Sequence, residues 1–500
     1  MMQKNILEYL EKTAFSHTDK LAFSNGKEGL TFGEVYSRSR AIGSFLSDNG
    51  YYRQPIAIIM DKHPNTLTAF WGTIYAGCFY ACIDEKMPQA RILAIFEKFK
   101  PSAIICDKKN YKVANSLSIE NIFIYDDIVG YPENADALAK IRARQSSTDA
   151  IYVAFTSGST GTPKGVVACH RSVIDYTEAL CDALPFSKDT IFGNQTPLYF
   201  DAPLKELMPT IKLGATTYFI PKMYFSFPVK LIEFLDNYKI NTVCWVVSAL
   251  VQISSLGALE VQVPQYLTTI CFGSELFPRK QYNLWREALP NTKFFNLYGP
   301  TEATGMSCYW AADRELNENE PIPIGRPFDN TDIILLDECM NESDEGEICI
   351  RGTCLTMGYY NDPEKTAEAF IQNPLNSAYT ERIYRTGDIG RRSEYGELVF
   401  LCRKDSQIKH MGHRIELGEI ELAALKSENV SQACCVYDDK KKRIVLFYTT
   451  NNSSAEVASH LQKLLPRYML PAIIQVLSAM PHTPNGKLDR KGLKEQAENL

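Results

Sequence analysis

A loop of glycines and hydroxyl-bearing residues, AFTSGSTGTPKGV, occupies residues 154–166 and contains one lysine, Lys164. An apolar stretch, IYVAF, precedes it and predicts a strand that runs into the loop. Glycines let backbone N–H groups approach an anion closely, and a lysine adds a positive charge for a phosphate. The residues that would do this are Thr156, Ser157, Gly158, Ser159, Thr160, Gly161, Lys164 and Gly165. The spacing is GxxGxxKG, whereas a Walker A loop needs GxxxxGK[ST], so we expect a phosphate loop of another kind.

Two further strings place a carboxylate next to a turn. NLYGPTEAT, residues 296–304, has a Gly-Pro turn that would present Tyr298 as a flat face and Glu302 as a carboxylate. YRTGDIG, residues 384–390, places Asp388 directly after a glycine. A carboxylate there suits a pair of hydroxyl groups, although a single aspartate in a turn more often caps the local backbone.

The segments around these strings alternate between strand and helix patterns. Residues 54–60, 79–83 and 102–107 are short apolar runs, while residues 64–76 and 88–99 carry apolar residues at helical spacing. This alternation predicts an α/β fold with layered sheets and helices.

The composition changes after residue 400. We expect a helix over residues 413–428, a strand over 443–450, a helix over 457–465 and a strand over 473–477. The sequence therefore predicts a large N-terminal domain, residues 1–402, and a small mobile α+β domain, residues 403–500.

Composition excludes several classes of partner. The formal net charge of -6 argues against a surface for nucleic acid or an anionic membrane. The N-terminus has no continuous apolar core typical of a secretory signal, and the longest apolar stretch is too short to span a bilayer. The 14 cysteines form no CxxC pair, so we interpret them as reduced thiols of a cytoplasmic protein rather than zinc ligands.

Six strings together resemble the superfamily of adenylate-forming enzymes, which includes acyl- and aryl-CoA synthetases, luciferases and the adenylation domains of nonribosomal peptide synthetases. They match in the family's order and cover the whole chain. The strings are residues 154–166, 296–304, 346–352 (GEICIRG), 384–390, 403–421 (RKDSQIKHMGHRIELGEIE) and 484–493 (PNGKLDRKGL).

The resemblance implies an ATP site with Mg²⁺. It suggests that Tyr298 stacks on adenine, Asp388 binds the ribose, Arg403 contacts the nucleotide and Glu302 helps to hold Mg²⁺. The implied ATP-binding residues are Thr156, Ser157, Gly158, Ser159, Thr160, Gly161, Asn296, Leu297, Tyr298, Gly299, Pro300, Thr301, Asp388, Phe400, Arg403 and Lys487.

The resemblance also implies two catalytic lysines and a hinge. Lys487 would bridge the substrate carboxylate and the α-phosphate, and would act with Lys164 and Glu302. The small domain would rotate about Asp405 between two half-reactions. Two positions depart from the family pattern: Cys402 stands where glycine is common, and Met411 replaces a frequent basic residue.

One string, YFDAPLKEL at residues 199–207, resembles the acceptor-binding region of the amino-acid-specific members. Asp201 matches the carboxylate that pairs with the α-ammonium group of the substrate. By alignment, the pocket residues are Asp201, Ala202, Lys205, Trp245, Ile270, Phe272, Leu297, Gly305 and Met306. The large pocket residues Trp245, Phe272 and Leu297 would leave room only for a small substrate side chain, such as that of Ala, Gly or Ser. Lys205 instead hints at an acidic substrate, unless its side chain extends out to solvent.

The layout resembles freestanding D-alanine–D-alanyl carrier protein ligases, with no carrier motif after residue 493. We therefore expect an amino-acid ligase that uses a separate phosphopantetheinylated carrier protein, with D-alanine as the leading candidate. Another freestanding peptide-synthetase adenylation enzyme, an acyl- or aryl-CoA synthetase and a catalytically inactive nucleotide-binding relative are the alternatives.

Overall fold

The computed structural model describes all residues of the chain except 1–2, 159–161, 318–319, 428–429, 451–453 and 483–487. The chain divides into two compact units. The first unit contains residues 1–85, 101–154 and 166–404, and the second contains residues 86–100, 155–165 and 405–500. The predicted boundary after residue 402 stays a prediction.

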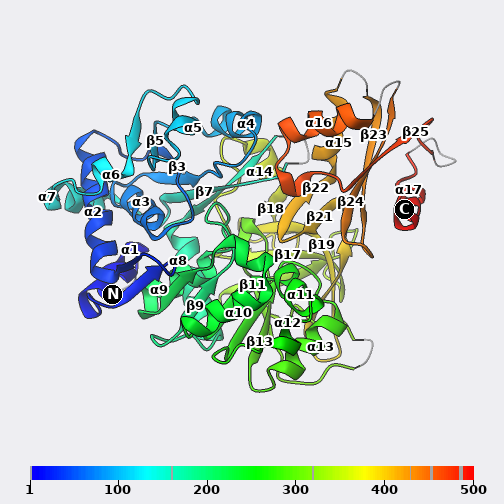
Figure 1. Ribbon diagram of the computed structural model, residues 1–500, viewed down its shortest axis with the longest axis horizontal. Helices are drawn as coiled ribbons and strands as arrows, with labels where there is room; N and C mark the ends of the chain where they lie inside the picture. The colour runs from blue at the N-terminus through cyan, green and yellow to red at the C-terminus, as the bar shows by residue number, and fades with distance from the viewer. Residues whose placement is uncertain (1–2, 159–161, 318–319, 428–429, 451–453, 483–487) are drawn as a thin grey trace. The chain divides into compact units, whose positions relative to one another are not determined.

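The described part of the first unit is built on three sheets, the largest of which has nine strands and is mostly parallel at its centre. In spatial order its strands are β15 (Arg326–Pro327), β14 (Cys308–Ala311), β13 (Lys293–Tyr298), β12 (Thr269–Gly273), β11 (Thr242–Val246), β9 (Ile191–Asn194), β10 (Thr216–Phe219), β1 (Leu21–Ser24) and β2 (Gly29–Thr31). Figure 1 shows β9, β11 and β13 in green with helices α10 to α13 beside them.

The second sheet has six described strands. In spatial order they are β6 (Ile122–Ile124), β5 (Ala103–Cys106), β3 (Pro55–Ile59), β4 (Phe79–Cys82), β7 (Ala150–Thr156) and β8 (Lys164–Cys169). The pairs that join β6, β5, β3, β4 and β7 are parallel. The ends of β7 and β8 that flank the phosphate loop belong to the second unit.

The third sheet is antiparallel over its described strands. It contains β16 (Thr331–Leu336), β17 (Glu345–Gly352), β19 (Arg382–Arg392), β18 (Phe370–Gln372) and β20 (Leu398–Arg403).

Helices cover these sheets. In the first unit they are α1 (Leu7–Ser16), α2 (Phe32–Asp48), α3 (Pro64–Tyr75), α5 (Tyr111–Asn115), α6 (Tyr125–Ile128), α7 (Ala135–Arg144), α8 (His170–Ala183), α9 (Leu204–Leu213), η1 (Lys222–Ser226), α10 (Pro228–Asn237), α11 (Val247–Ser255), α12 (Ala258–Val261), α13 (Arg279–Ala288), η2 (Thr301–Ala303) and α14 (Pro363–Ala369). The start of α2 has a capping box, because Thr31 and Glu34 each accept a backbone N–H from the other.

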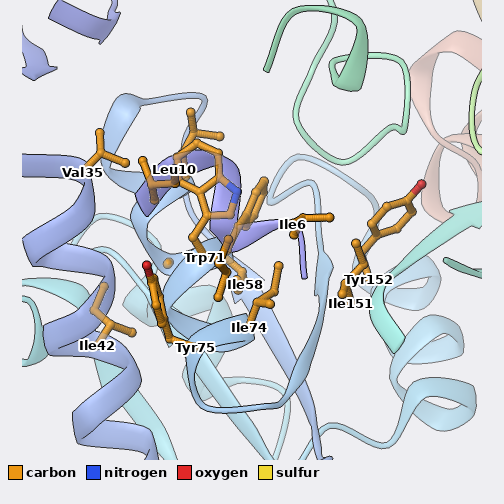
Figure 2. Packing of buried hydrophobic residues seen from close by; sticks show 14 of the residues in the cluster. Ile6, Leu10, Val35, Ile42, Ile58, Trp71, Ile74, Tyr75, Ile151 and Tyr152 are labelled. Carbon is orange, nitrogen blue, oxygen red and sulfur yellow. The ribbon is translucent and has the colours of Figure 1, made fainter. Parts of the chain in front are cut away.

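Helix α3 is buried almost all round, which suits a helix that carries no charged residue. Figure 2 shows Leu10 of α1 and Val35 and Ile42 of α2 around Trp71 of α3. Glycine is needed where α2 and α3 cross, since a Cβ at Gly72 would lie 2.6 Å from the Cβ of Ile42. This core supports β7, which leads towards the phosphate loop.

The second unit combines helices with two small sheets. Its elements are α4 (Gln89–Phe99), β21 (Gln407–His410), β22 (His413–Glu416), α15 (Leu417–Leu425), β23 (Val430–Asp438), β24 (Arg443–Thr450), α16 (Ser454–Leu464), η3 (Arg467–Met469), β25 (Ile473–Leu477) and α17 (Arg490–Asn499). The predicted helix over residues 413–428 is wrong at its start, because residues 413–416 form β22 and pair with β21. Met411 and Gly412 both have positive φ, of 51° and 78°, as a two-residue hairpin turn demands.

Candidate functional site

The predicted nucleotide-binding residues of the first unit come together through three strands. The hydroxyl of Tyr298, at the end of β13, donates to Asp388 Oδ2 at 2.6 Å. Arg403, at the end of β20, donates to the other carboxylate oxygen of Asp388, and β20 pairs with β19 at this position. All three residues are mostly buried, and each carboxylate oxygen of Asp388 keeps a lone pair for a further donor.

The segment after β13 is closely packed. A Cβ at Gly299 would lie 2.5 Å from the carbonyl oxygen of Gly305, so only glycine fits there. Asn296 donates from its side chain to the carbonyl oxygen of Pro323 at 2.7 Å. Leu297 is buried, whereas Pro300, Thr301 and the predicted ATP-binding residue Phe400 of β20 are half-buried.

Asp201 and Glu302 lie within electrostatic reach of each other. Burial raises the pKa of the Asp201 carboxyl, a hydrogen bond from Thr301 and the charge of Lys205 lower it, and the charge of Glu302 raises it. Asp201 is half-buried. The segment predicted to bind ATP and the carboxylate predicted to bind an amino acid therefore meet at Thr301 and Glu302.

Glu302 is the predicted Mg²⁺ ligand, and its surroundings suit a cation. Its side chain is fully buried, and its Oε1 accepts a hydrogen bond from the hydroxyl of Tyr359 at 2.8 Å. Carboxylate oxygens are ligands that Mg²⁺ prefers, and a divalent cation would offset the repulsion between Glu302 and Asp201. The residues present therefore fit the ion. The sequence motifs did not reveal Tyr359, because none of them contains it.

Lys205 lies buried on α9, and its neighbours balance its charge. Its side chain is 4% exposed, so it does not extend out to solvent. The positive charge of Lys205 lowers the pKa of both Asp201 and Glu206. Because two carboxylates of the protein already offset this charge, Lys205 does not require an acidic substrate.

The remaining predicted pocket residues fall into two hydrophobic clusters. Trp245, Ile270 and Phe272 lie on one face of β11 and β12, where the register pairs Trp245 with Phe272. The indole N–H of Trp245 donates to the carbonyl oxygen of Gly193 at 2.7 Å. Leu297 and Met306 pack in another cluster, beside Tyr176.

The last two predicted pocket residues are Gly305 and Ala202. A Cβ at Gly305 would lie 3.5 Å from the ring of Tyr176, and Ala202 is half-buried beside Asp201. Substrate-binding roles for all of these residues stay predictions.

Residues 155–165, which carry the predicted phosphate loop, belong to the second unit. Ser157 donates from its hydroxyl to the carbonyl oxygen of Arg414 at 2.7 Å, and Lys164 Nζ lies 3.8 Å from Glu416 Oε1. A Cβ at Gly158 would lie 2.0 Å from the carbonyl oxygen of Thr162, so the loop needs glycine there. Thr156 Oγ1 is buried without a hydrogen-bond partner among the described residues.

The predicted roles of five further residues stay predictions. Ser159, Thr160, Gly161 and Lys487 lie outside the described residues. The predicted hinge residue Asp405 accepts the backbone N–H of Gln407 at 3.1 Å, and its role as a hinge stays a prediction. Arg414 and Glu416 were missed as partners of the loop, although they lie in the 403–421 string.

All 14 cysteines lie in the described part of the chain, and all are free thiols there. None of the described helices is both long and apolar enough to cross a membrane.

Comparison with known proteins agrees with the fold and the motifs. The model of the AMP-binding enzyme family matches residues 10–360, and that of the AMP-binding enzyme C-terminal domain matches residues 419–487. These matches and the fold define an enzyme of the adenylate-forming class, with a large N-terminal and a small C-terminal domain. The chain belongs to the AMP-binding enzyme family, as its motifs predicted.

Three similar proteins illustrate the range of this family. Tyrocidine synthase 1 of Brevibacillus parabrevis is 27% identical over 98% of this chain, which spans 45% of that protein. D-alanine–D-alanyl carrier protein ligase of Bacillus licheniformis is 30% identical over 98% of this chain and 99% of its own. The Vibrio cholerae adenylation domain AlmE, in complex with glycyl-adenosine-5'-phosphate, superposes with a TM-score of 0.86 at 20% identity, covering 100% of this chain and 99% of its own.

The curated relatives differ greatly in length. The chain spans between 6% and 45% of the length of four synthases or synthase subunits that it matches. It spans nearly the full length of the two carrier-protein ligases.

Proposed function

We propose that this protein activates a small amino acid with ATP and transfers it to the phosphopantetheine thiol of a separate carrier protein. The contact of Asp201 with Thr301, beside Glu302, carries this proposal. In-line attack on the α-phosphate requires the amino acid and ATP to lie next to each other, and this contact joins the two strings assigned to them. D-alanine is the leading candidate, in keeping with the name of the Bacillus licheniformis relative.

In the first half-reaction the amino-acid carboxylate attacks the α-phosphate, which gives aminoacyl-AMP and releases pyrophosphate. The carboxylate is already ionised, so the protein needs no nucleophile of its own and acts by position and charge. Asp201 pairs with the α-ammonium group, which is a favourable partner for a desolvated carboxylate.

Three residues of the first unit hold the nucleotide. Asp388 accepts the ribose hydroxyls, while Tyr298 and Arg403 keep its carboxylate fixed through the hydrogen bonds described above. Glu302 would hold Mg²⁺, and the bound ion would neutralise phosphate charge. Lys164 and Lys487 offset the charge that builds on the phosphate and the substrate carboxylate.

In the second half-reaction the carrier thiolate attacks the mixed anhydride. The new thioester bond forms as the bond to AMP breaks, and AMP leaves. The separate carrier is argued from the full-length likeness to ligases whose names specify a carrier protein.

ATP–pyrophosphate exchange across amino acids, including both enantiomers of alanine, tests the first half-reaction. We expect exchange with a small amino acid and none with fatty or aryl acids. Lys487→Ala should lower the exchange by about 100-fold or more, because it removes charge stabilisation in the transition state. Exchange with a fatty acid but with no amino acid would contradict the assignment of Asp201.

A further inference from the structure

Residues 356–359 connect two parts of the first unit that carry ATP-binding strings. Val166 of β8, the strand that follows the predicted phosphate loop, forms an antiparallel bridge with Tyr359. The backbone N–H of Thr356 donates to the carbonyl oxygen of Glu302 at 3.0 Å. The fold therefore places beside Glu302 a segment that none of the six strings includes.

The backbone and the ring of Tyr359 are both held in place. Gly358 has a φ of 109°, and a Cβ there would lie 2.4 Å from Cγ2 of Thr366, so this position needs glycine. The backbone N–H of Tyr359 donates to Oγ1 of Thr366 at 2.9 Å. The ring of Tyr359 packs edge-on against Phe370, with the centroids 6.0 Å apart. These contacts direct the hydroxyl of Tyr359 at Glu302.

The hydrogen bond between Tyr359 and Glu302 joins two buried side chains. Oε1 of Glu302 accepts the hydroxyl at 2.8 Å, and neither residue is more than 8% exposed. A buried carboxylate is costly unless donors satisfy its oxygens, and hydrogen bonds to charged groups are stronger than those between neutral ones. The bond therefore supports the charge of Glu302 and resists rotation of its carboxylate.

We propose that Tyr359 is a positioning residue, which orients Glu302 for the divalent cation that accompanies ATP. This inference rests on the proposed function and deepens it, because it adds a residue that controls how strongly Mg²⁺ supports ATP binding. Tyr359 acts through Glu302 and does not itself touch the nucleotide. Removal of a group that holds a metal ligand in place commonly lowers metal affinity by about 10- to 100-fold.

Tyr359→Phe tests this role, because it removes the hydroxyl and keeps the ring that packs against Phe370. Calorimetry measures ATP binding at saturating Mg²⁺ and again in EDTA, without an amino acid, so that the measurement does not depend on activity. We expect the gain in ATP affinity that Mg²⁺ provides to fall by about 10-fold or more in the variant. The affinity in EDTA should stay near the wild-type value. A wild-type gain from Mg²⁺ in Tyr359→Phe would overturn the inference.

Tyr360→Phe is the matched control, because it removes the same hydroxyl from the next residue, whose ring lies 5.8 Å from that of Phe79. This variant should keep the wild-type gain from Mg²⁺, and an equal loss in both variants would count against the inference. Urea denaturation in EDTA separates a structural role from a positioning one. If Tyr359 only stabilised the fold, Tyr359→Phe would lower the free energy of unfolding and leave the gain from Mg²⁺ unchanged.

Glu302→Gln tests whether Tyr359 acts through the carboxylate. This variant should itself lose most of the gain from Mg²⁺, and adding Tyr359→Phe to it should cause no further loss, because effects that pass through one residue are not additive. A further loss as large as that in the wild-type background would contradict the inference. Failure of the proposed function looks different: the wild-type protein would show no ATP–pyrophosphate exchange with any amino acid, whereas the effect of Tyr359→Phe on ATP binding would remain measurable.

Discussion

At the scale of single residues, Lys62 and Glu206 both form hydrogen bonds with Asn194. Lys62 Nζ donates to the carbonyl oxygens of Asn194 and Gln195, each at 3.0 Å, and Asn194 donates from its side chain to Glu206 Oε2 at 3.0 Å. Burial lowers the pKa of Lys62 to about 7 and raises that of Glu206 to about 7. Both groups therefore titrate near neutral pH, each within reach of the other's charge.

Glu206→Gln should change how stability depends on pH below neutrality. Between its ordinary pKa of 4.5 and about 7, Glu206 keeps a proton in the folded state that the unfolded state has lost. Stability from this group is therefore lost as pH rises through that window. The wild-type free energy of unfolding, minus that of the variant, should fall by about 1–3 kcal/mol from pH 4.5 to 7 in urea denaturation.

Lys62→Met is the control, because Lys62 changes the pH dependence of stability above pH 7, whereas Glu206 changes it below pH 7. The folded state releases the Lys62 proton at about pH 7, while the unfolded state holds it to about 10.5. The wild-type free energy of unfolding, minus that of Lys62→Met, should therefore rise between about pH 7 and pH 10.5. If the difference in free energy of unfolding between wild type and variant did not change with pH for either variant, Lys62 and Glu206 would not titrate as stated.

At the scale of elements, periodicity correctly predicted three adjacent strands of the six-stranded sheet. The runs at residues 54–60, 79–83 and 102–107 became β3, β4 and β5, because buried parallel strands are continuously apolar. The error at residues 413–416 arose because HRIE carries no turn signal of its own, while the hairpin depends on the backbone of the two preceding residues.

The sequence predicted the site residues less completely. Motifs brought out Tyr298, Asp388 and Arg403, which the structure joins by hydrogen bonds. Periodicity could not reveal the partner of Glu302, since the hydrogen-bonded residue lies far from it in the chain. Tyr359 lies 57 residues after Glu302.

The β21–β22 hairpin offers a test of its turn. Gly412→Val should lower the free energy of unfolding of the second unit by about 1–3 kcal/mol, because a β-branched residue is strained at a φ of 78°. Met411→Asn is the control and should be neutral or stabilising, since asparagine tolerates the left-handed region at its φ of 51°. Thermal unfolding with hydrogen exchange at residues 407–416 measures both, and equal effects would contradict the turn type.

At the scale of the whole chain, the second unit is assembled from distant segments. Arg91 of α4 and Glu419 of α15 form a buried ion pair, although they lie 328 residues apart in sequence. Phe99 packs edge-on against Phe155, with centroids 5.9 Å apart, and Ser157 donates to the backbone of Arg414. Residues 86–100 and the described residues of 155–165 therefore share buried contacts with residues 405–500 or with each other.

A chain ending at residue 404 should lose protection in those two segments. Without residues 405–500, Arg91 keeps a buried charge with no carboxylate, and the loop residue Ser157 loses its acceptor, so local opening costs less. Hydrogen exchange should become at least about 10-fold faster in residues 86–100 and 155–165, and stay unchanged in β3 and β5. Glu419→Gln in the full chain is the matched control and should speed exchange in α4 alone, because Ser157 keeps its contact with Arg414. Unchanged protection in both segments of the shortened chain would mean that they fold with the first unit instead, and that the ion pair contributes nothing to their order.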